Sequence, residues 1–231
     1  MFGISLYQQK ILELRPEGRH RFDARTVFAS AAQAHVNTPY LSQIPCSWGA
    51  VYFPEHWREF HDYLAVRLSG SVLPISGIVA PGVRSNKWTR SWKKYYIELA
   101  FLRGYVMLYP NYRDYLSLST NHLEVGSHVK ETTPEAYELK KKLYQLPLLR
   151  ATPIHGFGSD EGVPSVETGL LDLPAERMPE WDALPVLDLL GLLTTAGEVH
   201  ARGAARSQEL FRCGSAEAAP GVRRSPVCPG W

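Results

Sequence analysis

Residues 91–111 contain the pattern that most limits what this chain can fold into. Aromatic residues and leucines recur there at three- and four-residue steps, which predicts a helix with one buried face: Trp92, Tyr95, Tyr96, Leu99 and Leu102. Gly104 stands where helices commonly end in a left-handed residue, and the apolar run 105–109 is typical of a buried strand. A helix that passes through a glycine into an apolar strand is an α/β unit. The sequence therefore predicts an α/β fold with flanking amphipathic helices.

Similar patterns organise residues 1–150 into one α/β region. Loose alternation over residues 2–15 predicts two short strands joined by a polar link at 8–10. Pro54 suits the first turn of a helix, because its missing N–H costs nothing there, and an apolar stripe predicts that this helix continues to Leu68. Shorter elements are expected as a helix at 26–34, a β-prone run at 72–79, and a helix at 134–145 capped by Thr132 or Thr133.

The pattern weakens after residue 150. We expect residues 151–193 to be an extension with one short helix at 184–193. Residues 194–231 are rich in Ala, Gly, Arg, Pro and Ser, and their apolar residues are too sparse to offset the entropy of ordering the chain. The sequence therefore predicts a disordered tail at 194–231, whose composition resembles a translated alternative exon or a shifted reading frame.

Composition and charge exclude several classes of protein. Hydrophobic residues make up 45% of the 231 residues, which is enough for a core. The formal net charge of +2 gives no electrostatic footprint for nucleic acid or an acidic membrane. No apolar run reaches the roughly 20 residues of a membrane span, and the N-terminus lacks the regions of a signal peptide. The abrupt, strand-like start is compatible with a truncated product of a longer chain.

The three cysteines are Cys46, Cys213 and Cys228, and no two of them form a CxxC pair. Zinc ribbons and thioredoxin-type motifs are therefore excluded. The odd count argues against a disulfide framework. One bridge is left open, and we expect Cys46 to be a free, buried thiol.

The candidate metal ligands are His122, Glu124 and His128. In an extended segment His122 and Glu124 point to the same side, and His128 can fold back past Gly126 to join them. Two imidazoles and a carboxylate suit a divalent metal. The other interpretation is that these are polar loop residues bonded to backbone.

Trp48 is the strongest candidate for a ring-binding platform. It lies in the segment 46–121, which contains four of the six tryptophans. Gly49 beside it would let a sugar or base ring approach closely, and stacking contributes on the order of 1–3 kcal/mol. The alternative is that Trp48 belongs to the core. Trp57 and Trp92 lie on the apolar stripes of their helices and are expected in the core.

Two carboxylates are candidates for a catalytic base. Glu98 lies in the middle of the predicted helix at 92–102, and Glu55 lies at the start of the helix at Pro54. A base needs a pKa raised by burial or by a like charge. At a helix N-terminus the ionised form of Glu55 is favoured instead, which makes a capping carboxylate the competing interpretation.

A dense basic cluster spans residues 84–94. Basic side chains at a helix start can hold a phosphate together with the free backbone N–H groups, and the interleaved tryptophans suit a nucleotide or glycan. The competing interpretation is a solvated helix start. The candidate substrate-binding residues are Trp48, Arg84, Asn86, Lys87 and Asn121.

The order of several short segments resembles the C-terminal, acceptor-side half of a glycosyltransferase of the GT-A type. The segments are Phe2-Gly3-Ile4-Ser5-Leu6-Tyr7, then Pro45-Cys46-Ser47-Trp48-Gly49-Ala50, then Tyr52-Phe53-Pro54 before a helix, and Ile97-Glu98-Leu99 before Arg103-Gly104-Tyr105. The resemblance covers roughly residues 1–150, and it implies an incomplete GT-A-like mixed sheet. It implies that the Glu98 carboxylate acts as the catalytic base. It also implies that His122 or His128 is a ligand of Mn or Mg.

The chain departs from this family in two respects. The nucleotide-binding βα units and the metal-binding Asp-x-Asp are absent. The resemblance therefore implies a fragment or isoform that is inactive alone. Its parent would use a sugar nucleotide and a glycan or protein acceptor in the secretory pathway, whereas this chain carries no address and would be soluble in the cytoplasm as it stands. Two alternatives stay open: a non-catalytic protein-interaction module with an aromatic-rich surface, and a purely structural isoform fragment.

Overall fold

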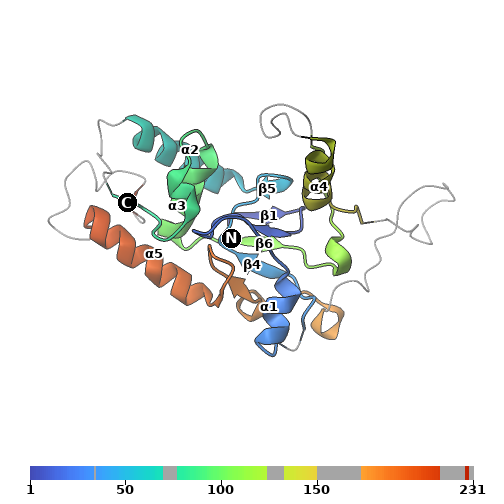
Figure 1. Cartoon of the computed structure of the whole chain (residues 1–231). Coiled ribbons are helices and arrows are strands. Elements are labelled where there is room, and N and C mark those ends of the chain that lie inside the picture. The colour runs from blue at the N-terminus through green and yellow to red at the C-terminus, as the bar shows by residue number, and fades with distance from the viewer. Residues whose placement is uncertain (34, 70–76, 124–132, 150–172, 214–226, 229–231) are drawn as a thin grey trace, which may run out of the picture.

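The protein is built on a six-stranded mixed sheet (Figure 1). The computed structural model describes residues 1–33, 35–69, 77–123, 133–149, 173–213 and 227–228. The strand order is β5-β1-β6-β4-β7-β8. The strands are β1 (Gly3–Ser5), β4 (Tyr40–Ser42), β5 (Ala50–Tyr52), β6 (Met107–Tyr109), β7 (Val186–Leu187) and β8 (Leu193–Thr194). A second sheet pairs β2 (Ile11–Leu12) with β3 (His20–Arg21).

Parallel and antiparallel pairs alternate across the main sheet. β1 pairs in parallel with β6 and antiparallel with β5. β4 pairs antiparallel with β6 and in parallel with β7, and β7 forms an antiparallel pair with β8. The predicted mixed α/β architecture is confirmed.

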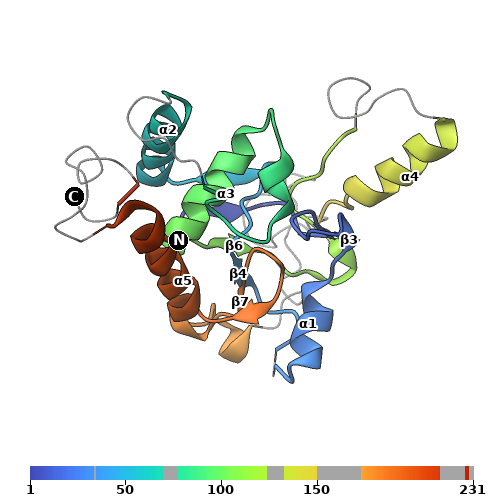
Figure 2. The same cartoon turned by 60° about the vertical axis from the view of Figure 1, so that its left-hand side comes forward.

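The longer helices gather on two sides of the sheet. Both views place α2, α3 and α5 together on one side and α1 and α4 towards the other (Figures 1 and 2). The helices are α1 (Ala24–Ser30), α2 (Pro54–Ser69), α3 (Trp92–Arg103), α4 (Pro134–Tyr144) and α5 (Ala196–Phe211). Short 3-10 helices are η1 (Arg84–Lys87), η2 (Arg113–Tyr115), η4 (Pro174–Glu176) and η5 (Trp181–Ala183).

The helix α3 is the most buried helix of the fold. Its central residues Tyr96, Ile97, Leu99 and Ala100 have no exposed surface. Gly104 ends the helix with φ of 62°, in the left-handed region that glycine adopts without strain. The predicted helix, its terminating glycine and the following strand β6 are therefore confirmed.

Local sequence signals also set the ends of the other helices. α2 begins at Pro54 as predicted. The Thr133 hydroxyl accepts the backbone N–H of Ala136 at 3.3 Å and caps α4. α1 begins two residues before the predicted Thr26, because the Asp23 carboxylate accepts the N–H of Arg25 at 3.0 Å.

The prediction that Trp57 and Trp92 are core residues is wrong. Their exposed fractions are 44% and 43%. The two indoles meet edge to face, with ring centroids 5.9 Å apart, where α2 and α3 pack together. Phe60 and Tyr96 occupy the buried positions beneath them.

The prediction of a helix at 184–193 is also wrong, because this segment forms the β7–β8 hairpin. The Asp188 carboxylate accepts the backbone N–H groups of Leu190 and Leu192 at 2.9 and 3.0 Å. Gly191 adopts φ of 73°. The side chain of Asp188 bonds nearby backbone N–H groups, and Gly191 adopts a left-handed conformation. Both features make a turn more stable than a helix in this segment.

The predicted disorder from residue 194 does not hold for the described residues there. Thr195 and Glu198 form a reciprocal capping box that starts α5. Val199 and Phe211 are buried. Gly203 lies against the backbone of α3, and a Cβ at this position would meet the carbonyl oxygens of Phe101 and Leu102. Close helix packing through a glycine therefore replaces the large apolar side chains that the tail lacks.

A disulfide joins Cys213 and Cys228 just beyond α5. Val227 is fully buried, and its carbonyl accepts a hydrogen bond from Arg103 at 3.0 Å. The bridge left open by the sequence therefore exists, and Cys46 is free and buried as predicted.

The contact between α3 and α5 can be tested with two glycines of the same helix. Gly203→Ala should lower the free energy of unfolding by about 2 kcal/mol, because the added methyl forces the helices apart. Gly197→Ala should raise the free energy of unfolding by about 0.5 kcal/mol. The added Cβ comes no closer than ordinary contact distance to its neighbours, and alanine is the better helix former. Urea unfolding measures both changes. Equal effects of the two variants would contradict the packing of α5 on α3.

Candidate functional site

The loop between β4 and β5 carries Trp48 to the surface of the sheet. The backbone N–H of Trp48 donates to the Cys46 sulfur at 3.4 Å. Gly49 follows with φ of 126°, and its carbonyl accepts the N–H of Leu6 at 2.7 Å. The Ser119 hydroxyl donates to the Trp48 carbonyl at 3.3 Å. These contacts fix the backbone on both sides of the indole.

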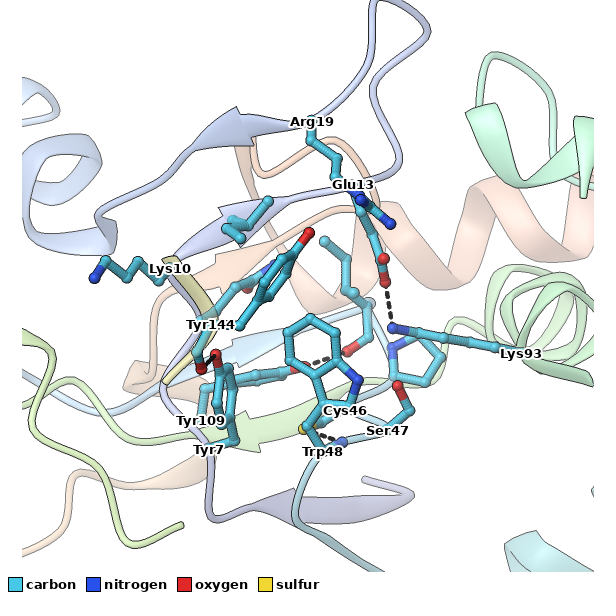
Figure 3. A pocket seen from close by; sticks show the side chains of 14 residues that line it. Tyr7, Lys10, Glu13, Arg19, Cys46, Ser47, Trp48, Lys93, Tyr109 and Tyr144 are labelled. Atoms are coloured by element: carbon cyan, nitrogen blue, oxygen red, sulfur yellow. Dashed lines mark hydrogen bonds and ion pairs between the residues drawn. The ribbon is translucent and has the colours of Figure 1, made fainter. Parts of the chain in front are cut away.

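The Trp48 ring stands between two tyrosines (Figure 3). Tyr7 and Tyr144 each meet it edge to face, with ring centroids 5.3 and 4.9 Å away. The Tyr7 hydroxyl donates to the Tyr144 carbonyl at 2.6 Å, which ties the segment after β1 to the end of α4. Edge-to-face contacts of this kind hold a ring in one orientation. The indole is only partly buried and so keeps surface free for a ligand.

A cavity of about 570 Å³ opens beside Trp48. This volume lies within the range of about 300–1,000 Å³ that small-molecule sites occupy. Most of the side chains that line it are aromatic, polar or charged: Glu13, Arg19, Ser47, Trp48, Trp88, Ser91, Trp92, Lys93, Asn121, His122, Leu123, Lys140 and Tyr144. They come from segments on both sides of the sheet, so the site exists only in the folded chain.

A smaller hollow of about 40 Å³ adjoins it and shares Glu13, Arg19, Ser47, Trp48, Lys93 and Tyr144 with the larger cavity. One water needs about 10–15 Å³ in this measure. The hollow therefore has room for a few waters and none for a sugar ring.

One ion pair crosses the boundary between the two cavities. The Lys93 ammonium from α3 contacts the Glu13 carboxylate, and both side chains are largely buried (Figure 3). Arg19 lies over the Tyr144 ring, with 5.8 Å between its guanidinium carbon and the ring centroid. The wall that faces a ligand thus combines rings with fixed charges.

The titratable groups near Trp48 favour binding over nucleophilic chemistry. Burial raises the pKa of Tyr7, and it also raises that of Tyr144 against the opposing charges of Arg19 and Arg84. Both phenols stay neutral donors at neutral pH. Burial likewise raises the pKa of the Cys46 thiol, and a thiol of this kind is a poor nucleophile.

Three residues predicted from the sequence meet at the larger cavity. Trp48, Asn121 and His122 all line it. The larger cavity is not lined by Arg84, Asn86 or Lys87, which belong to η1. The hydrogen bonds of Arg84 and Asn86 join η1 to residues outside the cavity. The N–H of Arg84 donates to the Leu14 carbonyl at 2.8 Å, and the Asn86 amide donates to the Ala80 carbonyl at 2.7 Å.

Neither predicted catalytic carboxylate lines either cavity. Glu98 is 2% exposed and accepts hydrogen bonds from the Tyr63 hydroxyl and from the Arg67 guanidinium, at 2.9 Å each. This cluster joins α2 to α3. Glu55 is exposed at the start of α2, beside His56 at 3.5 Å. The contacts of both residues describe structural roles, and a catalytic role for either stays a prediction.

The predicted metal site falls mostly outside the described residues. His122 is exposed at the cavity rim, whereas Glu124 and His128 lie in a segment that the structure does not describe. Within the described part of the chain, no group of three His, Cys, Asp or Glu residues is arranged to hold a metal ion. A site for Mn or Mg therefore stays a prediction.

Several lining residues were not selected from the sequence: Glu13, Arg19, Trp88, Ser91, Lys93, Lys140 and Tyr144. Trp88, Ser91 and Lys93 belong to the basic cluster at 84–94, so the sequence did point to their segment. Glu13, Arg19, Lys140 and Tyr144 come from segments far apart along the chain. Only the pairing of the strands brings them to one place.

Fold and site together define a mixed α/β domain with a cavity lined by aromatic and charged side chains. Residues 11–72, which are 62 of the 231 residues, match a family model described as the SPBC1E8.03c C-terminal domain. The matched segment includes Trp48 and all of α2. No curated protein and no solved structure matches the chain.

No helix in the described ranges is both long and apolar enough to cross a membrane.

The Trp48 loop can be tested by alanine at Gly49, with Gly18 as its control. Both glycines have nearly the same φ, 126° and 129°. A Cβ at Gly18 would meet nothing, whereas one at Gly49 would meet the Ser119 side chain. Gly18→Ala should cost about 1 kcal/mol of backbone strain, and Gly49→Ala about 1–2 kcal/mol more from the collision. Chemical denaturation measures both, and equal losses would contradict this loop geometry.

The role of Glu98 can be separated from catalysis by a matched pair of substitutions. Glu98→Gln should lower the free energy of unfolding by about 2 kcal/mol or more, because it leaves the largely buried Arg67 charge without its partner. Glu55→Gln should change it by no more than about 0.5 kcal/mol, as is usual at exposed positions. Thermal and urea unfolding report both changes. A Glu98→Gln protein as stable as the Glu55→Gln protein would refute the structural role.

Proposed function

We propose that this chain is a glycosyltransferase-like domain that binds the sugar of a glycan acceptor in the cavity beside Trp48. The single observation that carries the proposal is the meeting of Trp48, Asn121 and His122 at one cavity of about 570 Å³. These residues lie up to 74 positions apart in the sequence (122 − 48 = 74). A site that gathers an indole, an amide and an imidazole has the components of sugar recognition.

The chemistry of the lining supports a sugar ligand. A pyranose presents apolar C–H faces and a rim of hydroxyls. The rings of Trp48, Trp88 and Trp92 offer flat surfaces for those faces, and Ser91 and Asn121 offer donors and acceptors for the hydroxyls. Because Trp48 is already held by two tyrosines, it loses little freedom when a ring stacks on it.

The proposal assigns acceptor binding, and not sugar transfer, to this chain. The sequence has no Asp-x-Asp and no nucleotide-binding βα units. Transfer from a sugar nucleotide would need both, so the chain would act as a fragment or isoform beside a complete enzyme. A divalent metal, if His122 helps to hold one, would supply charge neutralisation for a donor diphosphate.

A second candidate function is a non-catalytic protein-interaction module. The observation that favours it is the exposed pair Trp57 and Trp92 on the surface of α2 and α3. Val51 on the edge strand β5 is a further half-exposed apolar side chain. Tryptophans are enriched at protein interfaces. The two candidates differ in their ligand, since only the first one binds free sugars.

Substitution of Trp48 tests the first candidate. Titration of the full chain with a panel of soluble neutral and acidic oligosaccharides, followed by NMR, should show binding. Trp48→Phe should weaken it by about tenfold, equivalent to about 1.4 kcal/mol, because the smaller ring keeps the contacts with Tyr7 and Tyr144 but stacks over less area. Trp181→Ala removes an indole of 43% exposure that lines neither cavity and should change nothing.

Binding that is equal in wild type and Trp48→Phe would contradict the proposal. Absence of binding to every oligosaccharide would favour the interaction module instead.

A further inference from the structure

The charges that line the larger cavity are unbalanced. Among the residues that the structure describes, three cationic side chains line it, Arg19, Lys93 and Lys140, against one carboxylate, Glu13. Glu13 is already occupied, because it contacts the Lys93 ammonium. Two cations therefore face the cavity beyond the internal pair.

Those two cations have no carboxylate of their own in the part of the chain that the structure describes. The ion pairs found there involve neither Arg19 nor Lys140. On α4 the neighbouring Lys141 pairs with the Glu138 carboxylate at 3.9 Å. Arg19 is exposed and lies over the Tyr144 ring instead.

The positions of the cations suit one ligand. Tyr144 neighbours both of them: Arg19 lies over its ring, and Lys140 precedes it by one turn on α4. Tyr144 also touches Trp48, the proposed platform for the sugar ring, at 4.9 Å between centroids. A ring stacked on Trp48 would therefore carry its substituents towards both cations.

We propose that the sugar bound beside Trp48 is acidic, a pyranose with a carboxylate, sulfate or phosphate group that Arg19 and Lys140 hold. The inference rests on the proposed function and specifies its substrate class. Guanidinium binds such groups through two parallel hydrogen bonds, and ammonium adds a mobile point charge. Glu13 does not repel the anion, because Lys93 neutralises it.

Matched sugar pairs test the proposal on the full chain. The probes are methyl glycosides of a hexose and of the corresponding hexuronic acid, in the gluco, galacto and manno configurations, with the 6-phosphates as the second source of charge. At least one acidic member should bind about tenfold more tightly than its neutral counterpart, as expected for charge-assisted hydrogen bonds. The preference should shrink when the ionic strength rises from about 0.05 to about 0.5 M.

Charge removal provides the matched variants. Arg19→Gln combined with Lys140→Gln should bring the affinities for the acidic and neutral sugars to within about twofold of each other. Arg21→Gln combined with Lys141→Gln removes two neighbouring cations that line neither cavity and should leave the preference intact. Calorimetry or NMR titration gives the dissociation constants.

The remaining outcomes overturn the inference, and they do so in distinguishable ways. Equal binding of the acidic and neutral sugars refutes it but leaves the proposed function standing. Inorganic phosphate or UDP that binds more tightly than every acidic sugar, and loses affinity in the Arg19/Lys140 variant, assigns the cations to a free anion or to a donor nucleotide. No binding by any sugar removes the proposed function and this inference together.

Discussion

The burial of α3 between the sheet and two other helices is the constraint on which the rest of the structure depends. Tyr96 has no exposed surface and stacks on Phe60 of α2, with centroids 4.4 Å apart. On another side Gly203 brings α5 against the α3 backbone. The same helix sends Lys93 to the cavity, so the core that stabilises the fold also positions a charged group of the site.

The sequence predicted this centre well, because its signals are local. The α3 stripe, the left-handed Gly104 and Pro54 at the start of α2 each act within a few residues. The errors arose where distant contacts decide. Gly203 counts as a helix breaker until its close contact with α3 is known, and the Asp188 carboxylate bonds two backbone N–H groups that a helix would have used otherwise.

The candidate site was predicted in part for the same reason. Trp48 was identifiable because an indole beside a glycine is a local pattern. Arg19 and Tyr144 were not, since 125 residues separate them (144 − 19 = 125) and neither lies in a motif. Glu98 shows what a local pattern leaves out. A carboxylate in the middle of an apolar helix suggests a catalytic base, which stays a prediction, whereas its hydrogen bonds from Tyr63 and Arg67 depend on the packing of α2 on α3.

The disulfide between Cys213 and Cys228 makes the environment of the chain a determinant of its shape. Closing a loop of 15 residues lowers the conformational entropy of the unfolded chain, which stabilises the folded state by about 3 kcal/mol. Such bridges persist in oxidising compartments and are reduced by cytosolic glutathione. In a reducing compartment the covalent link between Cys213 and Cys228 would be lost. The hydrogen bond from Arg103 to the Val227 carbonyl would then hold Val227 beside α3 without it. The attachment of the C-terminal segment to α3 would then vary with the redox poise of its surroundings.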